Sequence, residues 1–345
     1  MNAADILNRI TKAKRSQASL QRYLEQQDEI LGSKVKWCGS WLHFREWIQT
    51  GESRLLNANF CKKHLLCKAC AVRRAAKLYE AYLPKIRSVV EAHSEKLIPA
   101  MVTLTTKNGP DLLERLEAFK AGWSAMLAAK RKGASNSKKN IPVEWNKVLG
   151  SLRAIEVTQG KDGGWHVHAH IFVLLHDYID QRELSAEWER FTGDSFIVDV
   201  RKCKNGIEAG LLEVLKYSCK FSSMTSEQVY HVHQTFNGTR LVDPQGLFRG
   251  VPEPDIDNDD ISDMSGPYRD FIARWIASEK KYLLDYLDEP KDFRMPRPPS
   301  SSLRVPVSPS VMVSVEEKLL REAMKTRPTL AMEQASLTMR KKHDC

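Results

Sequence analysis

Histidine alternates with small apolar residues in the segment 165–175, and this pattern constrains the fold more than any other feature of the chain. His166, His168 and His170 are spaced two residues apart, with Val167 and Ala169 between them. Side chains alternate between two faces along a β-strand, so the segment predicts a strand with three imidazoles on one face and an apolar opposite face. Such a strand belongs in a sheet whose apolar face is covered.

A glycine-rich break over residues 160–164 precedes this strand and predicts a β-hairpin. The partner strand is expected over residues 152–158, and folding back around Asp162 brings Glu156 next to His168. A carboxylate combined with imidazoles suits Mg²⁺ or Mn²⁺ bound beside a phosphate. The alternative is a partly exposed strand whose histidines are held in hydrogen bonds. A second histidine pair, residues 231 and 233, is interpreted as part of a surface strand.

A second group of candidate residues lies on a helix predicted over residues 206–221. At about 100° per residue, one face of this helix is apolar and the opposite face is polar. The polar face carries Glu213, Lys216, Tyr217 and Lys220. A tyrosine flanked by a carboxylate and by cations is arranged as a nucleophile, although the same pattern also describes an ordinary solvated face.

Cysteines in the N-terminal part of the chain predict a structural zinc site. Three of them cluster, namely Cys61, Cys67 and Cys70. Structural Zn²⁺ usually takes four ligands, so Cys38 is the natural fourth, and His64 or His43 could take its place. Free structural cysteines are the alternative. A catalytic thiol is not expected, because no accompanying His/Asn arrangement is visible.

The formal net charge of +10 favours a polyanionic partner, either nucleic acid or an anionic membrane surface, but is also compatible with simple solubility. No apolar run approaches the roughly 20 residues that span a bilayer, and the first residues do not resemble a secretory signal, so a cytoplasmic protein is expected. Basic residues, several of them in a predicted loop over residues 130–140, are candidate contacts to such a polyanion. These candidates are Arg73, Arg74, Lys130, Arg131, Lys132, Lys138, Lys139, Arg201, Lys202 and Lys204.

The order of elements predicts an α+β fold, with a central antiparallel sheet, flanking helices and a small N-terminal cysteine-rich zinc-binding element. Besides the hairpin, strands are expected over residues 100–106 and 196–201 and helices over residues 2–30, 71–78, 111–130 and 181–191. We expect four regions: residues 1–95, helical and cysteine-rich; 96–222, carrying the histidines and the tyrosine; 223–286, an extension of unknown role; and 287–345, a Pro/Ser-rich tail expected to be disordered.

Taken in order along the chain, these motifs resemble those of the replication initiators (Rep proteins) of small rolling-circle plasmids, in the HUH endonuclease superfamily. The resemblance covers residues 38 to about 222. The matching segments are residues 38–39, 57–61, 67–74, 102–105, 153–158, 165–170, 198–202 and 213–220. The chain departs from the family pattern at Lys68, where proline is frequent, and at Ala169, where a bulky residue is usual.

The resemblance implies an HUH-like domain that nicks one strand at an origin, leaving a 5′-phosphate on Tyr217 and a free 3′-hydroxyl. It favours His168 and His170, with Glu156, as ligands of the divalent cation and leaves the role of His166 open.

Further expectations concern the neighbours of the tyrosine and the partners. Glu213 is expected to activate water for a hydrolytic second cleavage, with strand transfer, at termination, and Lys220 to assist the phenol or neutralise phosphate. The resemblance implies four partners: plasmid origin DNA, as a single-stranded or cruciform nick site, a host helicase, a host polymerase, and a second copy of the chain in a homodimer.

Two other classes of protein share some of these features. A relaxase or transposase of the same superfamily uses similar histidines and tyrosines, but typically adds a second tyrosine or a further domain. A non-catalytic zinc-containing DNA-binding regulator would explain the cysteines and the charge, with merely structural histidines. A metal-dependent, tyrosine-linked product on single-stranded origin DNA would favour the initiator over this regulator.

Overall fold

The computed structural model describes residues 3–133, 143–160, 163–217, 224–287, 291–293, 318–319 and 321. The chain forms two compact units. One unit comprises Met1–Leu78, Thr225–Tyr230 and Glu253–Cys345, and the other comprises Tyr79–Met224 and His231–Pro252. We call them the cysteine unit and the histidine unit after their candidate site residues. Among the described residues, no helix is long and apolar enough to cross a membrane.

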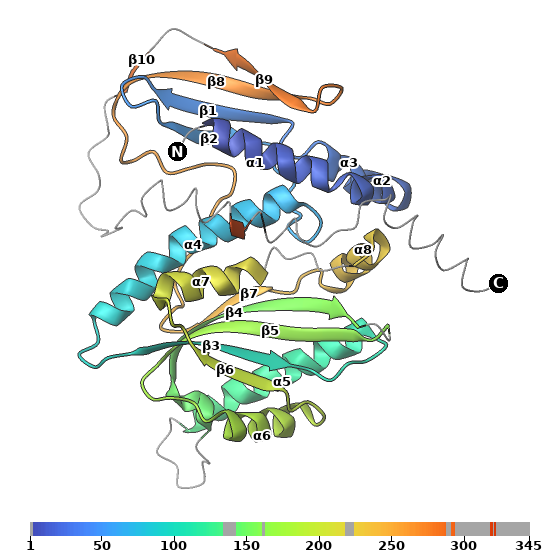
Figure 1. Cartoon of the computed structure of the whole chain (residues 1–345), viewed down its shortest axis with the longest axis vertical. Coiled ribbons are helices and arrows are strands. Elements are labelled where there is room, and N and C mark those ends of the chain that lie inside the picture. Colours follow the sequence, from blue (N-terminus) through green and yellow to red (C-terminus); the bar gives the residue numbers. More distant parts are fainter. Residues whose placement is uncertain are drawn as a thin grey trace, which may run out of the picture. The chain divides into compact units, whose positions relative to one another are not determined.

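An antiparallel sheet of five strands forms the centre of the histidine unit (Figure 1). Its strands are β3 (Ile98–Thr105), β4 (Val148–Gln159), β5 (Trp165–Leu175), β6 (Val198–Lys202) and β7 (Val242–Gly246), in the order β6-β3-β5-β4-β7. The four strands predicted here are confirmed, with small shifts of their ends. Strand β7 was not predicted because Pro244 interrupts its pattern, and proline is tolerated at a sheet edge.

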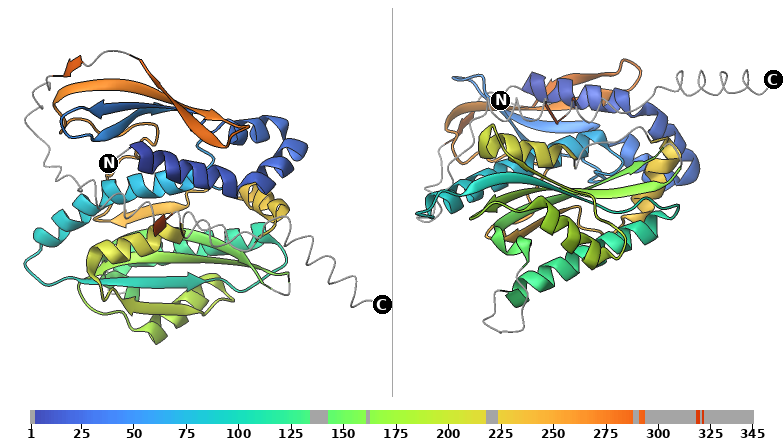
Figure 2. Two further views of the ribbon diagram at one scale, coloured as in Figure 1. Left: turned by 45° about the horizontal axis from the view of Figure 1, so that its top comes forward. Right: turned by 60° about the horizontal axis from the view of Figure 1, so that its bottom comes forward.

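Helices cover both faces of this sheet, as Figure 2 shows. On one face lie α5 (Leu112–Gly133) and α6 (Gln181–Thr192), and the buried Arg153 of β4 lies over the rings of Phe119 and Trp123 in α5. On the other face lies α7 (Gly206–Tyr217), where a Cβ on Gly210 would come within 2.7 Å of the Phe172 ring. Phe172 shares its face of β5 with the histidines, so α7 packs on the histidine face.

The helix ends in this unit follow from local chemistry. The Asp180 carboxylate caps α6 by accepting from the amides of Arg182 and Glu183, and Gly193 ends it with a φ of 83°. Helix α5 extends past the predicted end at residue 130 and includes residues 131–133, which the sequence assigned to a loop, so that part of the prediction was wrong. The rest of the predicted basic loop, residues 134–140, lies outside the described residues.

The cysteine unit contains a second antiparallel sheet, which the sequence did not predict. Its strands are β1 (Trp41–Trp47), β2 (Ser53–Ala58), β8 (Gly266–Ile276), β9 (Lys281–Tyr286) and β10 (Lys291–Phe293), in the order β10-β8-β1-β2, with β9 also paired to β8. Strands β1 and β8 pair along their length, and the buried Phe44 and Phe271 stack at 5.3 Å. The fold therefore has two sheets instead of the single central sheet expected.

Helices α1 (Ala3–Ser16), α2 (Ala18–Gln27) and α3 (Glu29–Lys36) replace the single helical start predicted over residues 2–30. Asp28 begins α3 because its carboxylate accepts from the amide of Leu31 at 2.9 Å. Helix α4 (Lys68–Glu91) extends the predicted helix over residues 71–78 in both directions.

The interpretation of residues 231–233 as a surface strand was wrong. They lie in α8 (Ser226–Thr235), which buries Val229 and Val232 and is followed by the buried Phe236. Spacings of three and four residues between buried positions are those of a helix, and this longer pattern outweighs the short His-x-His alternation.

Candidate functional site

Glu156, His168 and His170 come together on one face of the hairpin β4–β5. Glu156 lies opposite His168 in the strand register, as the sequence predicted. One carboxylate oxygen, Oε2 of Glu156, lies 3.0 Å from Nε2 of His168 and 3.2 Å from Nε2 of His170. The turn residue Asp162 lies outside the described residues, but Gly160 and Gly164 close the hairpin with a backbone hydrogen bond of 2.8 Å.

Burial makes this group chemically distinctive. Glu156 is only 3% exposed and His170 only 8% exposed, so the carboxylate depends on its imidazole neighbours or on a cation for compensation. On the neighbouring strand Thr103 lies opposite His170, and its Oγ1 is 3.2 Å from His170 Nδ1. That contact fixes the ring orientation of a candidate ligand. The sequence did not reveal Thr103, because its partner lies far along the chain.

The geometry of the group fits a hard divalent cation. An octahedral ion with bonds of about 2.1 Å holds adjacent donors about 3.0 Å apart. The two nitrogen–oxygen separations are 3.0 and 3.2 Å, and the ligand atoms of all three residues lie within 4.8 Å of one another. The same separations are compatible with direct imidazole–carboxylate hydrogen bonds, and metal titration distinguishes the two.

His166 lies beside this group but is not part of it. Its ring centroid is 4.9 Å from that of His168, and its Nδ1 is 3.3 Å from Oγ1 of Thr158. Burial is the main cause that lowers the pKa of His166, and the nearby His168 adds to it. The three candidate ligands brought together are therefore Glu156, His168 and His170.

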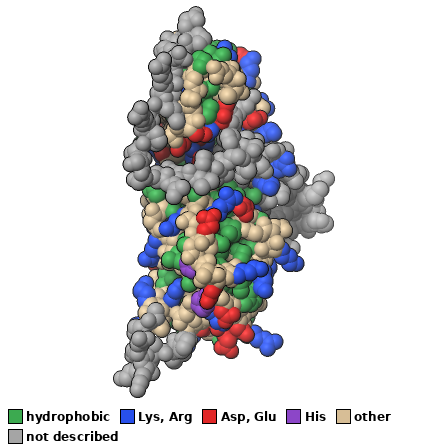
Figure 3. All heavy atoms as spheres, turned by 90° about the vertical axis from the view of Figure 1, so that its left-hand side faces the viewer, with side chains coloured by type: hydrophobic (Ala, Val, Ile, Leu, Met, Phe, Trp, Pro, Cys, Tyr) green, Lys and Arg blue, Asp and Glu red, His purple; other side chains and the backbone are tan. Residues whose placement is uncertain are grey.

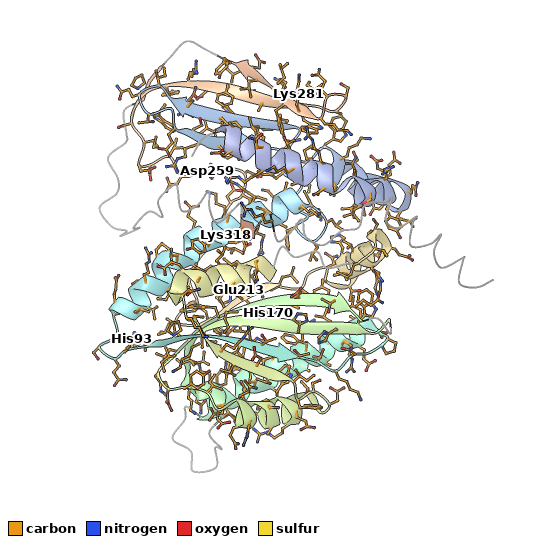
Figure 4. All side chains as sticks on the ribbon, viewed as in Figure 1. His93, His170, Glu213, Asp259, Lys281 and Lys318 are labelled. Atoms are coloured by element: carbon orange, nitrogen blue, oxygen red, sulfur yellow. The ribbon has the colours of Figure 1, made fainter. Side chains whose placement is uncertain are left out.

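Helix α7 carries two of the predicted catalytic residues, Glu213 and Tyr217. Leu211, Val214 and Leu215 are buried, which confirms the predicted apolar face. Glu213 is partly exposed and forms an ion pair with Lys216 at 2.6 Å. Figure 4 shows Glu213 on α7 and His170 on β5, two elements that contact each other.

Two of the predicted catalytic residues have no described side chain. Tyr217 is the last residue of α7, and its backbone alone is described. Lys220 lies outside the described residues, as do Lys138 and Lys139 of the predicted basic loop.

Four cysteines in the cysteine unit form a second candidate metal-binding group. Cys38 Sγ lies 3.5 Å from the sulfur of Cys67 and 3.5 Å from that of Cys70, while Cys61 Sγ lies 3.6 Å from Cys70. A tetrahedral zinc site with Zn–S bonds of about 2.3 Å has sulfur–sulfur edges of about 3.8 Å, so the donor set fits structural Zn²⁺. Cys38 joins the other three, whereas His43 instead lies 3.6 Å from the carboxylate of Asp270.

The local backbone explains how these cysteines meet. Gly39 adopts a φ of 62° directly after Cys38, a conformation that suits glycine, and turns the chain from α3 into β1. Cys67 directly precedes α4, and Cys70 lies in its first turn. Side-chain hydrogen bonds with the neighbouring thiols, that of Cys38 first, lower the pKa of Cys67. Lys14 donates to the carbonyl of Cys38 at 2.6 Å, and burial lowers its pKa.

Some predicted DNA contacts are held inside the protein. Arg73 is 6% exposed and binds the Asp259 carboxylate at 2.6 Å, so its position favours a structural role over DNA contact. Arg74 forms an ion pair with Glu253 at 2.7 Å. Lys130 is partly buried and donates to the carbonyl of Val148, and burial lowers its pKa.

The remaining described candidates for DNA contact lie at the surface. Arg131, Lys132, Lys202 and Lys204 are exposed, and Arg201 is exposed while it pairs with Asp199 at 2.6 Å. On the face in Figure 3, Lys and Arg side chains are scattered among acidic and apolar ones. The positive charge visible there is therefore dispersed.

The chain is similar to known replication proteins. A protein-family model described as Replication protein matches residues 52–283. Relatives named Protein rep come from Lentilactobacillus hilgardii (26% identical over 289 residues, 73% of this chain and 87% of that protein), Bacillus sp (29% over 191 residues, 51% and 57%) and Bacillus amyloliquefaciens (24% over 298 residues, 72% and 83%). No solved structure matches the chain significantly. The chain therefore belongs to the Rep family of replication proteins, the rolling-circle plasmid initiators that its motifs resemble.

Proposed function

We propose that this protein initiates rolling-circle replication by nicking one strand of a plasmid origin, with Tyr217 as the nucleophile. Membership in the Rep family supports initiation of plasmid replication. The observation that carries the chemistry is the buried Glu156–His168–His170 group on the sheet face against which α7 packs. That arrangement supports an HUH-type nicking domain, for which we retain residues 96–222.

Glu156, His168 and His170 would hold Mg²⁺ or Mn²⁺, the cations that suit mixed nitrogen and carboxylate donors beside phosphate. When bound, the cation would polarise the scissile phosphate and stabilise charge on its oxygens. Thr103 would keep the His170 ring oriented through its contact at 3.2 Å. The buried Glu156 carboxylate would keep both imidazole Nε2 atoms converged on one point.

The residues of α7 would supply the nucleophilic steps. The Tyr217 oxygen would form a bond to phosphorus as the bond to the 3′-oxygen breaks, giving a 5′-phosphotyrosine and a free 3′-hydroxyl. At termination Glu213, one helical turn earlier, would take a proton from water for the hydrolytic second cleavage, and the 3′-hydroxyl freed by that cleavage would attack the phosphotyrosine in strand transfer and release the Tyr217 oxygen. The ion pair of Glu213 with Lys216 at 2.6 Å supports a charged carboxylate able to take that proton. Lys220 would neutralise phosphate.

The cysteine group would bind structural Zn²⁺ through Cys38, Cys61, Cys67 and Cys70, within a zinc region that we place in residues 1–95.

The remaining assignments made from the sequence are also proposals. They describe residues 223–286 as an extension of unknown role and residues 287–345 as a tail. DNA-backbone contacts are proposed for the predicted basic residues other than Arg73 and Lys130, whose side chains are engaged within the protein. Host helicase and polymerase, a second copy of the chain and a cytoplasmic location also remain proposals.

Incubation with single-stranded oligonucleotides that tile the replicon encoding the chain tests this function. In Mn²⁺ one oligonucleotide should be cleaved at one position, with its 5′-phosphate end attached to protein. Addition of a chelator before the DNA should prevent the reaction. Cleavage that continues in the presence of chelator would contradict the proposal. Binding of DNA without cleavage in any metal would also contradict it and would favour the DNA-binding regulator.

A further inference from the structure

A row of side chains crosses the sheet of the histidine unit at the level of His168. His168 lies opposite Glu156 of β4 on one side and opposite Thr105 of β3 on the other. The Thr105 amide donates to the carbonyl of Ile197 at 3.1 Å, which extends the register of β3 and β6 by one residue. Opposite residues in antiparallel strands share a face, so Ile197 lies on the histidine face, about 10 Å from His168.

Ile197 is exposed, whereas the two buried residues of the adjoining strand β6 lie on the opposite face. Its side chain is 59% exposed, whereas Val198 and Val200, on the opposite face of β6, are 7% and 8% exposed. Single exposed apolar residues are common on protein surfaces, so exposure by itself implies nothing. Ile197 is of interest because it lies in one row with the candidate metal ligands Glu156 and His168.

The backbone that presents Ile197 is held firmly. The buried Ser195 hydroxyl donates to Asp194 at 2.6 Å and accepts from the Lys107 amide at 2.9 Å. Arg115 binds Asp194 at 2.7 Å, and the indole of Trp188 donates to the carbonyl of Thr105 at 2.9 Å. An apolar side chain on such a support is ordered before a ligand arrives, which lowers the entropic cost of binding.

Two exposed cationic side chains lie on either side of Ile197. Lys107 follows Thr105 by two residues, and Arg201 lies four residues further along the chain on the same face of β6, where it pairs with Asp199. Cations that neutralise backbone phosphates, combined with side chains that pack against bases, are how proteins hold single-stranded nucleic acid. The nearby candidate metal group, which is proposed to act on a DNA phosphate, favours a nucleotide over a protein as the occupant.

We propose that Ile197 packs against the base of a nucleotide adjacent to the scissile phosphate and so positions the single strand for cleavage. This inference rests on the proposed nicking function and adds a positioning residue to it. An aliphatic side chain accepts any base, with an added contact for the methyl group of thymine.

A thermodynamic cycle between the side chain and the base tests the inference. The wild type first maps the cleaved bond on the tiling oligonucleotides. The affinity for DNA is then measured by fluorescence anisotropy in the presence of chelator, for the wild type and for Ile197→Ala. Each protein is tested on the natural strand and on two modified strands, one with an abasic nucleotide on the 5′ side of that bond and one with an abasic nucleotide on its 3′ side. Ile197→Ala should weaken binding of the natural strand about fivefold, at the low end of stacking effects.

One of the two abasic strands should bind the wild type about fivefold more weakly, and Ile197→Ala should weaken that strand no further. Phe196→Ala is the matched control. Phe196 is 58% exposed but, as the preceding residue of an extended segment, faces the other side of the sheet, so its removal should change affinity less than about twofold. Ile197→Phe should preserve or strengthen binding, since an aromatic ring also stacks on bases.

Ile197 does not contact a flanking base if Ile197→Ala and Phe196→Ala weaken DNA binding equally. The same conclusion follows if Ile197→Ala weakens binding of both abasic strands as much as it weakens binding of the natural strand. The inference is then overturned while nicking by the wild type stands. Failure of the wild type to cleave any strand overturns the proposed function, and the inference falls with it. Unchanged melting temperatures show that the variants are folded.

Discussion

Glu156 is the residue on which the candidate metal group depends. Its Oε2 contacts both imidazoles, at 3.0 and 3.2 Å, from a nearly fully buried position. An amide in place of this carboxylate removes the negative charge but retains a hydrogen-bonding oxygen, so the variant Glu156→Gln should fold while it loses the harder ligand.

We therefore expect Glu156→Gln to bind Mn²⁺ more than about tenfold more weakly in calorimetric titration. Asp199→Asn is a suitable control, because Asp199 lies opposite Thr103 on the same sheet face but outside the group. Equal Mn²⁺ affinity in wild type and Glu156→Gln would mean that the three residues form only hydrogen bonds.

Asp259 is a buried carboxylate whose role is structural. Burial alone raises the pKa of Asp259, but Arg73 at 2.6 Å and Lys77 at 2.9 Å outweigh it and hold that pKa well below the ordinary range. A carboxyl with a depressed folded-state pKa contributes stability that is present above its unfolded-state pKa, about 3.9, and is lost as pH falls toward the folded value.

Asp259→Asn should therefore lower the free energy of unfolding by about 3 kcal/mol at pH 7, because it leaves two buried cations without their anion. The difference from wild type should shrink progressively below about pH 5. Urea unfolding at several pH values measures it, with the exposed Asp263→Asn as control. A difference that stays constant down to pH 3 would contradict this role.

Residue contacts could be predicted from the sequence where the two partners are close along the chain. The Glu156–His168 pairing follows from a local hairpin, and the sequence predicted it. The carboxylate that binds Arg73 comes 186 residues later, so the charge of Arg73 could not be recognised as internally compensated. For the same reason nothing in the sequence indicated that Thr103, although in a segment that matches the family, contacts His170, or that Ile197 lies in the row of His168.

Among the elements, α7 determines whether the tyrosine can act with the metal group. Gly210 allows the helix to lie close to the sheet, since a Cβ there would come within 2.7 Å of both the Phe172 ring and the Cys203 sulfur. Any larger residue must shift α7 or its support, and small misplacements of reacting groups are costly.

Gly210→Leu should slow nicking by roughly 100-fold, on the scale expected for a displacement of about 1 Å. Its Mn²⁺ affinity should remain that of the wild type, because Glu156, His168 and His170 lie on β4 and β5. Ala209→Leu, on the adjacent and partly exposed position of α7, is the control. Wild-type nicking by Gly210→Leu would show that close packing of α7 is not required.

The predicted elements differ in how local their signals are. Strands β3 to β6 and helices α5 to α7 carry clear periodicities, and the sequence predicted all of them. Strand β1 mixes three aromatic residues with His43, Arg45 and Glu46, and its partner β8 lies more than 200 residues later in the chain. No local pattern indicates a pairing between segments so far apart in the chain, so the second sheet was not predicted.

For the whole molecule, the chain path joins distant segments. The cysteine unit combines residues before position 79 with residues after position 252, and β1 and β8 bring the two parts into one sheet. The four cysteines connect the turn after α3, the segment after β2 and the start of α4 within that unit. Zinc bound there would stabilise the unit by mass action on the folded state.

We expect one zinc per chain by elemental analysis, and a melting temperature about 10 °C lower after zinc is removed by a chelator. Cys38→Ser should show the same loss without chelator. Cys203→Ser, a cysteine of the histidine unit outside the group, should keep its zinc. Zinc content unaffected by Cys38→Ser would remove Cys38 from the ligand set.

The proposed function requires that Tyr217 becomes covalently joined to the cleaved strand. The measurement is peptide mass spectrometry of the wild type, Tyr217→Phe and Glu213→Gln after reaction with the cleaved oligonucleotide in Mn²⁺. We predict a nucleotide adduct on the peptide containing Tyr217 in the wild type and in Glu213→Gln, and none in Tyr217→Phe. An adduct that persists in Tyr217→Phe, or one found on a different residue of the wild type, would contradict the claim.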